Sequence, residues 1–282
     1  MTVPFGTRLH AAVAARGPLC AGIDPHAALL DAWGLTDDVA GLERFALSAT
    51  EALAPEVAIL KPQSAFYERF GSRGVAVLER VIEASRAAGA LVLLDVKRGD
   101  IGSTTQAYAD AYLDPASPLA ADAITASPYL GFGSLDPMVD TARKHDAGVF
   151  VLALTSNKEG AEVQHARTED GALVAGRMLQ HLSALNLGAE PLGSFGAVIG
   201  ATIGGLPDSG AELDFAFNGP ILAPGFGAQG GTVADIRRIF GSAVAAVTPS
   251  SSRDLLTKGP SPDAMRVEAV RLNDELRALQ AG

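Results

Sequence analysis

The feature that most constrains the fold of this chain is the repeated alternation of short apolar runs with helix-compatible stretches. The runs are Leu19–Ile23, Val57–Leu60, Leu91–Val96, Ala123–Ala126, Val149–Leu154, Gly196–Ile203, Pro220–Ala223 and Ala243–Val247. Short continuous apolar runs are typical of strands buried on both faces of a parallel sheet. Because the alternation repeats about eight times, it favours a closed (β/α)8 TIM barrel over an open doubly wound sheet.

The stretches between the runs have apolar residues spaced three and four apart, which is the spacing of amphipathic helices packed on a sheet. We expect such helices over Val39–Leu53, Val75–Ala88 and Thr232–Phe240. A last helix packed on the outside is expected over Pro262–Leu279, because apolar residues recur there at helical intervals, namely Met265, Val267, Val270, Leu272, Leu276 and Leu279.

One domain spanning residues 1–282 accounts for the whole chain, since barrels of about 250 residues commonly form one unit. Hydrophobic residues make up 48% of the 282 residues, which is ample material for a buried sheet covered by helices. Asn157–Ser194, with a helical-looking Ala172–Leu187, and Gly204–Gly219 are expected to be insertions over the barrel mouth.

Charge and composition exclude several classes of partner. A formal net charge of −10 disfavours a nucleic-acid partner, because binding to a phosphate backbone uses clustered Lys and Arg. The single cysteine, Cys20, excludes an intrachain disulfide and suits a reducing compartment. Residues 1–16 lack the pattern of a secretory signal, and no apolar run approaches the roughly 20 residues that span a bilayer. We therefore expect a cytoplasmic protein without membrane or nucleic-acid partners.

Polar residues follow the apolar runs in turn, where the carboxyl ends of barrel strands carry active sites. They are Asp24, Lys61, Asp95 with Lys97, Ser127, Thr155, Gln229 and Arg253. Side chains two apart in a strand share a face, so Asp95 and Lys97 are expected to point together into the barrel mouth. Burying two charges costs several kcal/mol per ion unless they pair, so this pair could simply plug the barrel. Lys61 and Asp100 add a second base and a second acid, which packing alone does not explain.

A glycine-rich segment late in the chain indicates an anion site. Gly225, Gly227, Gly230 and Gly231 let backbone N–H groups approach a ligand closely, and a predicted helix begins just after them. Arg253, after the last strand, can offer a fork of donors to phosphate oxygens, although it could also be a surface arginine that caps a helix. Loops after strands seven and eight are where barrels often bind phosphate.

The run Asp95-Val-Lys97-Arg-Gly-Asp100-Ile101-Gly-Ser-Thr104 resembles the D-x-K-x-x-D-I-x-x-T signature of the orotidine 5'-phosphate decarboxylase family, in particular its longer, actinobacterial-type subgroup. The resemblance covers most of the chain. It extends over Gly22-Ile-Asp24-Pro, Leu60-Lys61-Pro-Gln-Ser-Ala-Phe66-Tyr67, Ser127-Pro-Tyr-Leu-Gly131, Leu154-Thr-Ser-Asn157, Ala223-Pro224-Gly-Phe-Gly-Ala-Gln229-Gly230-Gly231 and Ser251-Ser-Arg253.

This resemblance implies decarboxylation of orotidine 5'-phosphate to UMP without a metal or any other cofactor. Lys97 would protonate C6 of the pyrimidine, and Asp95 would lie against the substrate carboxylate and hold Lys97. Lys61 would bridge Asp95 and the ribose, and Asp24 would accept a ribose hydroxyl. Further contacts to the substrate would come from Ser127, Pro224, Gln229, Gly230 and Arg253.

The resemblance also implies a homodimer with shared active sites, in which Asp100, Ile101 and Thr104 reach into the neighbouring subunit's site. The sequence does not determine which subunit Asp100 serves, and a surface salt bridge is its simpler alternative. The pyrimidine would be read by the loop Thr155-Ser156-Asn157. This loop departs from the commoner Ser-Ser or Ser-His pattern of the family, so the choice between Thr155 and Ser156 stays open.

Three other functions fit a barrel with these residues. A Mg²⁺-dependent enzyme acting on sugar phosphates shares the D-x-K-x-x-D strand, but it typically has a carboxylate where Lys61 stands, and a lysine repels a divalent cation. A Schiff-base aldolase also uses a lysine at the end of a barrel strand, although flanking carboxylates favour the ammonium form of Lys97 over a neutral amine. A phosphate-ligand binding barrel without catalysis is the third possibility.

Overall fold

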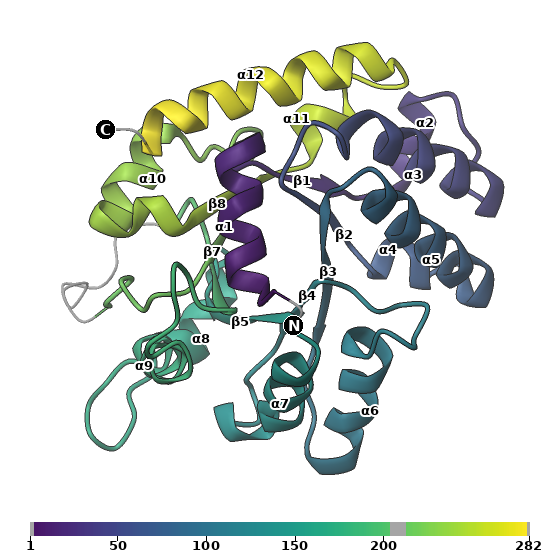
Figure 1. Cartoon of the computed structure of the whole chain (residues 1–282). Coiled ribbons are helices and arrows are strands. Elements are labelled where there is room, and N and C mark those ends of the chain that lie inside the picture. Colours follow the sequence, from purple (N-terminus) through teal and green to yellow (C-terminus); the bar gives the residue numbers. More distant parts are fainter. Residues whose placement is uncertain (1–2, 204–212, 281–282) are drawn as a thin grey trace.

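Eight short strands pair in parallel, each with the strand that follows it in the chain, and the last pairs with the first, so the sheet closes into a barrel (Figure 1). The structure, a computed structural model, describes residues 3–203 and 213–280. The strands are β1 (Cys20–Ile23), β2 (Ile59–Pro62), β3 (Leu91–Arg98), β4 (Ala123–Ala126), β5 (Gly148–Leu154), β6 (Phe195–Ile199), β7 (Ile221–Pro224) and β8 (Val247–Ser251). The predicted (β/α)8 TIM barrel is confirmed.

Helices connect the strands around the outside of the barrel. They are α2 (Ala27–Ala32), α3 (Val39–Leu53), α4 (Ala65–Glu68), α5 (Gly71–Ala87), α6 (Gly102–Leu113), α7 (Asp136–Lys144), α8 (Ala161–Gln164), α9 (Val174–Leu185), α10 (Val233–Phe240), α11 (Arg253–Leu256) and α12 (Pro262–Gln280). The described residues also form the 3-10 turns η1 (Phe132–Leu135), η2 (Lys158–Gly160) and η4 (Gly241–Ala246). The last helix, α12, packs against α3 and α10, so it joins the outer helices of the first and last parts of the chain.

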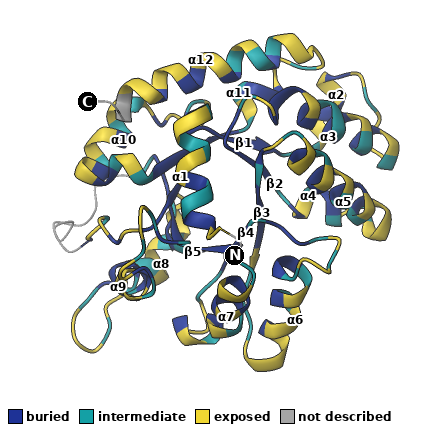
Figure 2. Cartoon of the chain, in the orientation of Figure 1, coloured by how far each residue is buried: buried dark blue, intermediate teal, exposed yellow. Residues whose placement is uncertain are grey.

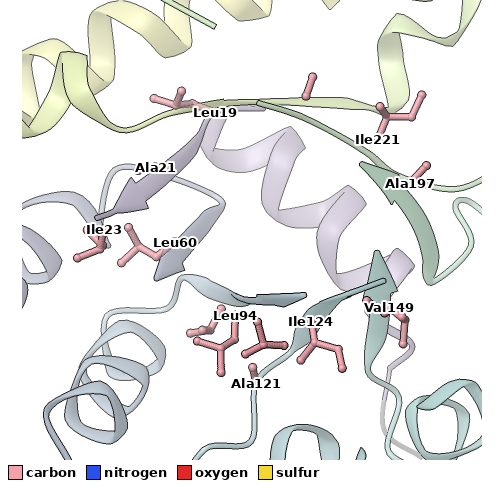
Figure 3. Packing of buried hydrophobic residues seen from close by; sticks show 14 of the residues in the cluster. Leu19, Ala21, Ile23, Leu60, Leu94, Ala121, Ile124, Val149, Ala197 and Ile221 are labelled. Atoms are coloured by element: carbon pink, nitrogen blue, oxygen red, sulfur yellow. The ribbon is translucent and has the colours of Figure 1, made fainter. Parts of the chain in front are cut away.

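Alternate residues of each strand face opposite sides of the barrel wall, and the two sides form separate apolar clusters. Outward residues such as Leu94 and Ile124 point toward the surrounding helices (Figure 3). Inward residues, including Ile59, Leu93 and Phe150, fill the barrel interior. Figure 2 shows the result, with buried strands at the centre and exposed residues on the outer faces of the helices.

The N-terminal helix α1 (Phe5–Arg16) lies across the barrel, at the end opposite the carboxyl ends of the strands (Figure 1). Its Phe5 and Leu9 belong to the interior cluster, and the Phe5 ring meets that of Phe150 edge to face, with centroids 5.9 Å apart. Arg8 forms an ion pair with Asp122, the residue before β4. The barrel therefore has a closed base and one open rim.

Two strand predictions were wrong in their bounds. Ala243–Val247 was expected to be the last strand, but residues up to Ala246 form η4, and β8 begins at Val247. The real strand has polar Thr248, Ser250 and Ser251 among its residues, which hides it from a search for apolar runs. Gly196–Ile203 was too long, since β6 ends at Ile199 and the buried residues beyond it lie in a loop.

The other corrections concern packing outside the strands. Helix α9 packs on β5 and β6 as an ordinary barrel helix, so only the earlier part of Asn157–Ser194 is an insertion near the rim. On α12, Val267 and Val270 are exposed, and Ala269 and Asn273 are buried in their place. The first nine residues of the predicted insertion Gly204–Gly219 lie outside the described residues. Among the residues that the structure describes, no helix has the length and apolarity needed to cross a membrane.

Candidate active site

A cavity of about 360 Å³ opens at the rim of the barrel, where the strands end. Its size falls in the range of small-molecule sites, which is about 300–1,000 Å³. Eight of the residues predicted from sequence line it, namely Asp24, Lys61, Asp95, Lys97, Thr155, Pro224, Gln229 and Arg253. The structure thus brings together residues from both halves of the chain at the carboxyl ends of the strands, where the active site was predicted.

The floor of the cavity follows from the alternation of side chains along each strand. Leu93 faces the apolar interior, and Asp95 and Lys97 follow it at two-residue intervals on the same face of β3. In β2, Lys61 follows the interior Ile59 in the same way. The barrel interior is therefore apolar below and charged at the rim, and the predicted shared face of Asp95 and Lys97 is confirmed.

Asp95 stands between two ammonium groups. Its Oδ2 accepts a hydrogen bond from Lys61 Nζ at 3.1 Å, and its Oδ1 accepts one from Lys97 Nζ at 2.6 Å. Asp95 is 5% exposed and Lys61 6%, whereas the side chain of Lys97 is 44% exposed and borders the cavity. The buried ion pair of Asp95 and Lys61 thus holds the charged group in place, and the Lys97 ammonium faces the cavity, where a ligand can reach it.

Electrostatics keep both buried groups ionised. Burial by itself would raise the pKa of Asp95, but the charges of Lys61 and Lys97 with their hydrogen bonds outweigh it and lower that pKa to about 2. Burial would lower the pKa of Lys61, yet the charges of Asp95 and Asp24 raise it above its usual value. A fixed carboxylate and a fixed ammonium therefore line the cavity at neutral pH.

Two polar residues that the sequence reasoning missed complete this network. Gln63 Nε2 donates to the backbone oxygen of Asp95 at 3.2 Å, and Gln63 Oε1 accepts from Lys97 Nζ at 3.5 Å. Thr125 Oγ1 donates to Asp95 Oδ1 at 2.8 Å. Thr125 could have been found from its register, because it lies two residues after the interior Ala123 at the end of a strand.

Asp24 lies just after β1 and offers an unused acceptor to the cavity. Its Oδ1 is buried and makes no hydrogen bond to the described residues, and a buried polar atom of this kind usually has a partner. The hydroxyl of Tyr67 is likewise buried without a partner in the described chain, and burial, with the charge of Asp24 second, raises its pKa well above the usual value. Asp24 is thus prepared to accept a hydroxyl from a ligand.

At the opposite wall, the glycine-rich segment forms a tight loop beside Arg253. Gly225, Gly227 and Gly230 all have positive φ angles. A side chain at Gly227 would come within 2.1 Å of Asp254 Oδ2, so this position requires glycine. Asp254 Oδ2 accepts from Ser251 Oγ at 2.7 Å and from the backbone N–H of residue 228 at 2.9 Å.

Asp254 therefore fastens the loop to β8 at the wall that Gln229 and Arg253 line. The helix predicted to follow the loop is α10, and it begins with a capping box between Thr232 and Asp235. Arg253 begins α11 and lines the cavity, so its side chain serves this wall of the site.

The loop after β5 brings Thr155 to the cavity, and Ser156 faces a separate, smaller pocket. Thr155 N donates to Gln164 Oε1 at 2.8 Å, and Gln164 Nε2 donates to Thr155 Oγ1 at 2.8 Å. Thr155 Oγ1 in turn donates to Asn157 Oδ1 at 2.6 Å. Gln164 of α8 therefore holds Thr155 in place through both of its amide atoms, a contact that no sequence motif indicated.

The remaining predicted residues do not line the cavity of this chain. They are Asp100, Ile101, Thr104, Ser127, Ser156 and Gly230. Asp100 Oδ1 accepts from Ile101 N at 2.8 Å, and Asp100 makes no ion pair with the described residues, so the alternative of a surface salt bridge within this chain is not seen. Ile101 is 64% exposed, and Tyr129, in the loop after β4, is 74% exposed.

Comparisons with known proteins agree over the length of the chain. A sequence model of the orotidine 5'-phosphate decarboxylase / HUMPS family matches residues 17–259. The chain is 72% identical to an orotidine 5'-phosphate decarboxylase of a Nocardioides species, covering 98% of this chain and 100% of that protein. It is 61% identical to that of Streptomyces coelicolor, covering 97% of each.

Solved structures agree as well. A Streptomyces avermitilis protein, for which orotidine 5'-phosphate decarboxylation has been proposed, is 60% identical with a TM-score of 0.96 and covers 100% of this chain and 97% of its own. The OMP decarboxylase of Leishmania donovani is 31% identical, with a TM-score of 0.77 and coverage of 99% and 100%.

Proposed function

The chain belongs to the orotidine 5'-phosphate decarboxylase / HUMPS family, and we propose that Lys97 delivers the proton when it converts orotidine 5'-phosphate to UMP and CO2. It is an enzyme, a carboxy-lyase of pyrimidine biosynthesis like the relatives it matches. The observation that carries the assignment of Lys97 is its ammonium group, held by Asp95 at 2.6 Å and presented to the cavity.

The chemistry follows from where charge appears. When the C6–CO2 bond breaks, its electron pair stays on C6, and a proton must replace the lost group. An ammonium at this carbon stabilises charge that exists only as the bond breaks, and interactions of this kind raise the rate. Asp95 lies against the substrate carboxylate in the ground state and keeps Lys97 oriented. No metal ion or other cofactor takes part in this proposal.

The other residues hold the rest of the substrate. Asp24 accepts a ribose hydroxyl with Oδ1, which has no hydrogen-bond partner among the described residues, and Lys61 bridges Asp95 and the ribose. The phosphate lies between Gln229 and Arg253, with Pro224 and Gly230 of the glycine-rich loop beside it. Thr155 is the stronger candidate for the pyrimidine contact because it lines the cavity and Ser156 does not. Ser127, just after β4, contacts the substrate only once the substrate is bound.

We further propose that the enzyme is a homodimer with shared active sites. Asp100, Ile101 and Thr104 lie away from the cavity of their own chain, and the apolar side chain of Ile101 is exposed. Residues in this position are available to complete the site of a second subunit. One barrel domain over residues 1–282, a cytoplasmic location and the absence of nucleic-acid and membrane partners complete the proposal.

Two alternatives predict different measurements. A Mg²⁺-dependent reaction would stop when EDTA removes the metal, whereas we expect full turnover in excess EDTA because Lys61 and Lys97 already compensate Asp95. A Schiff-base aldolase would be trapped by borohydride with a carbonyl substrate, and we expect no such adduct on Lys97.

The central test follows the loss of absorbance when purified enzyme meets orotidine 5'-phosphate. Lys97→Ala is expected to abolish turnover while UMP binding, measured by calorimetry, persists. Lys144→Ala, on the outer helix α7, is the matched control and is expected to act as wild type. Turnover by Lys97→Ala would show that Lys97 is not the proton donor. If the wild-type protein binds UMP but releases no CO2 from orotidine 5'-phosphate, a non-catalytic binding barrel is favoured.

A further inference from the structure

The hydroxyl of Thr125 joins the two charged residues at the centre of the site. Thr125 lies on the inward face of β4, is 0% exposed and lines the cavity. Its Oγ1 donates to Asp95 Oδ1 at 2.8 Å and accepts from the backbone N–H of Lys97 at 2.9 Å. A hydroxyl has a single hydrogen and a carboxylate can only accept, so the direction of both hydrogen bonds is fixed.

The backbone of β3 is irregular where Thr125 contacts it. Leu94 pairs with Ile124, but the next pair joins Arg98 to Ala126, so three residues of β3 stand opposite the single residue Thr125. Lys97 has a φ of +47°, in the left-handed region that residues with side chains rarely adopt. Bulges of this kind turn a side chain in a new direction and interrupt the ladder. The Lys97 N–H that leaves the ladder is the one that Thr125 accepts.

The same hydroxyl therefore acts on Lys97 from two sides. It holds the backbone at the bulge, and it holds Asp95 Oδ1, the atom to which Lys97 Nζ bonds at 2.6 Å. Loss of the hydroxyl would free both restraints while the apolar floor below stays intact. Lys97 would keep its charge but lose a fixed direction toward the substrate.

We infer that Thr125 is a positioning residue of the decarboxylation, which sets the direction of the Lys97 ammonium by holding its backbone and its carboxylate partner at once. This inference rests on the proposed role of Lys97 as proton donor. Thr125 itself does not exchange a proton with the substrate.

The test compares Thr125→Val, which keeps the shape and removes the hydroxyl, with Thr125→Ser, which keeps the hydroxyl. We expect Thr125→Val to lower kcat by about 10- to 100-fold, the scale of a small misplacement of a reacting group, with UMP affinity changed by less than about 3-fold. Thr125→Ser should retain kcat within about 3-fold of wild type. Thr125→Cys, a weak hydrogen-bonding group of similar size, should fall between the two and serves if valine prevents folding.

A matched control separates positioning from stability. Thr50 on α3 is also buried, and its hydroxyl donates one hydrogen bond, to Ala46 O at 2.8 Å, far from the cavity. Thr50→Val is expected to keep wild-type kcat. The pH profile gives a further readout, because the Thr125 hydrogen bond helps to lower the pKa of Asp95. In Thr125→Val the acid limb of kcat should therefore begin at higher pH than in wild type.

Several results would overturn the inference. One is a kcat of Thr125→Val, or of Thr125→Cys where valine does not fold, that equals the wild-type value. Another is a Thr125→Ser enzyme as slow as Thr125→Val, and a third is a loss of UMP affinity that accounts for the whole loss of activity. If instead wild type itself fails to decarboxylate, or Lys97→Ala remains active, the proposed function fails and this inference fails with it.

Discussion

Replacing Asp95 with asparagine tests whether the rim network also stabilises the fold. The change removes the carboxylate that Lys61 and Lys97 share and leaves Lys61, only 6% exposed, without its counter-ion. A carboxyl group whose pKa falls from 3.8 to about 2 on folding contributes about 2 kcal/mol at neutral pH. Breaking a buried ion pair by removing one partner costs roughly 3–5 kcal/mol. We therefore expect Asp95→Asn to lower the free energy of unfolding by about 2–5 kcal/mol at pH 7.

The pH dependence of this difference is specific to a lowered pKa. Because folding lowers the pKa of Asp95, its contribution is complete above 3.8, the value of the unfolded chain, and is lost as the pH falls through about 2. At pH 3 the carboxyl group of Asp95 is mostly protonated in the unfolded chain and mostly ionised in the folded protein. The difference between wild type and Asp95→Asn should therefore shrink by about 1 kcal/mol between pH 7 and pH 3.

Urea unfolding of both proteins across this pH range measures the effect, since contributions from other groups cancel in the difference. Asp170→Asn is the matched control, because the pKa of Asp170 is also lowered to about 2, by a hydrogen bond from Arg177, but its side chain is 61% exposed. Solvent and salt screen such a pair, so we expect no resolvable loss there. A difference for Asp95→Asn that stays constant or grows toward pH 3 would refute the reasoning.

Three further predictions concern the phosphate wall, the Thr155 loop and the barrel base. Arg253→Ala should weaken UMP binding by about 10- to 100-fold and leave uridine binding unchanged, because it removes only charge-assisted hydrogen bonds to phosphate. Calorimetry with both ligands measures this, and equal losses of affinity for UMP and uridine would contradict it. Gln164→Leu removes both hydrogen bonds to Thr155 and should raise KM for orotidine 5'-phosphate more than it lowers kcat in steady-state kinetics. A change in kcat alone would argue against a role of this loop in substrate binding. Arg8→Met removes the ion pair with Asp122 and should lower Tm by roughly 2–5 °C in calorimetry at unchanged kcat, and an unchanged Tm would show that the pair adds nothing.

The fold could be predicted from the sequence wherever apolar runs and strands coincide. Most of the runs did coincide with strands, because a parallel barrel buries both faces of each strand. The predicted bounds were wrong at β8, where inward-facing Ser250 lines the cavity and breaks the apolar pattern. The predicted packing was also wrong on α12, where Asn273 is buried because its amide donates to Glu56 O and accepts from Leu19 N. Buried polar residues with specific partners are invisible to a hydrophobic pattern.

The candidate site divides in the same way. Asp95 could be placed from strand register, and the glycine-rich segment from its composition. Lys97 lines the cavity beside Asp95 as predicted, but the bulge of β3 that directs it is not part of the two-residue pattern. Gln164 and Asp254 could not, because each acts through a contact between loops that no local pattern encodes. Asp100 and Thr104 were attached to the site by resemblance, and the geometry of one chain leaves them apart from it. Their position is a question about assembly, which a test of oligomeric state with Ile101→Asp can address.

The helix that closes the base of the barrel has a consequence for how the chain reaches its native state. Phe5 and Leu9 can be buried only after strands from across the sequence have assembled, since Gly6 N bonds to Ser194 Oγ, 188 residues away. The α1 segment is synthesised before these strands, so it must stay undocked until they have formed. A bulky group fused directly before Phe5 would compete with that late docking step, so purification tags belong at the other terminus.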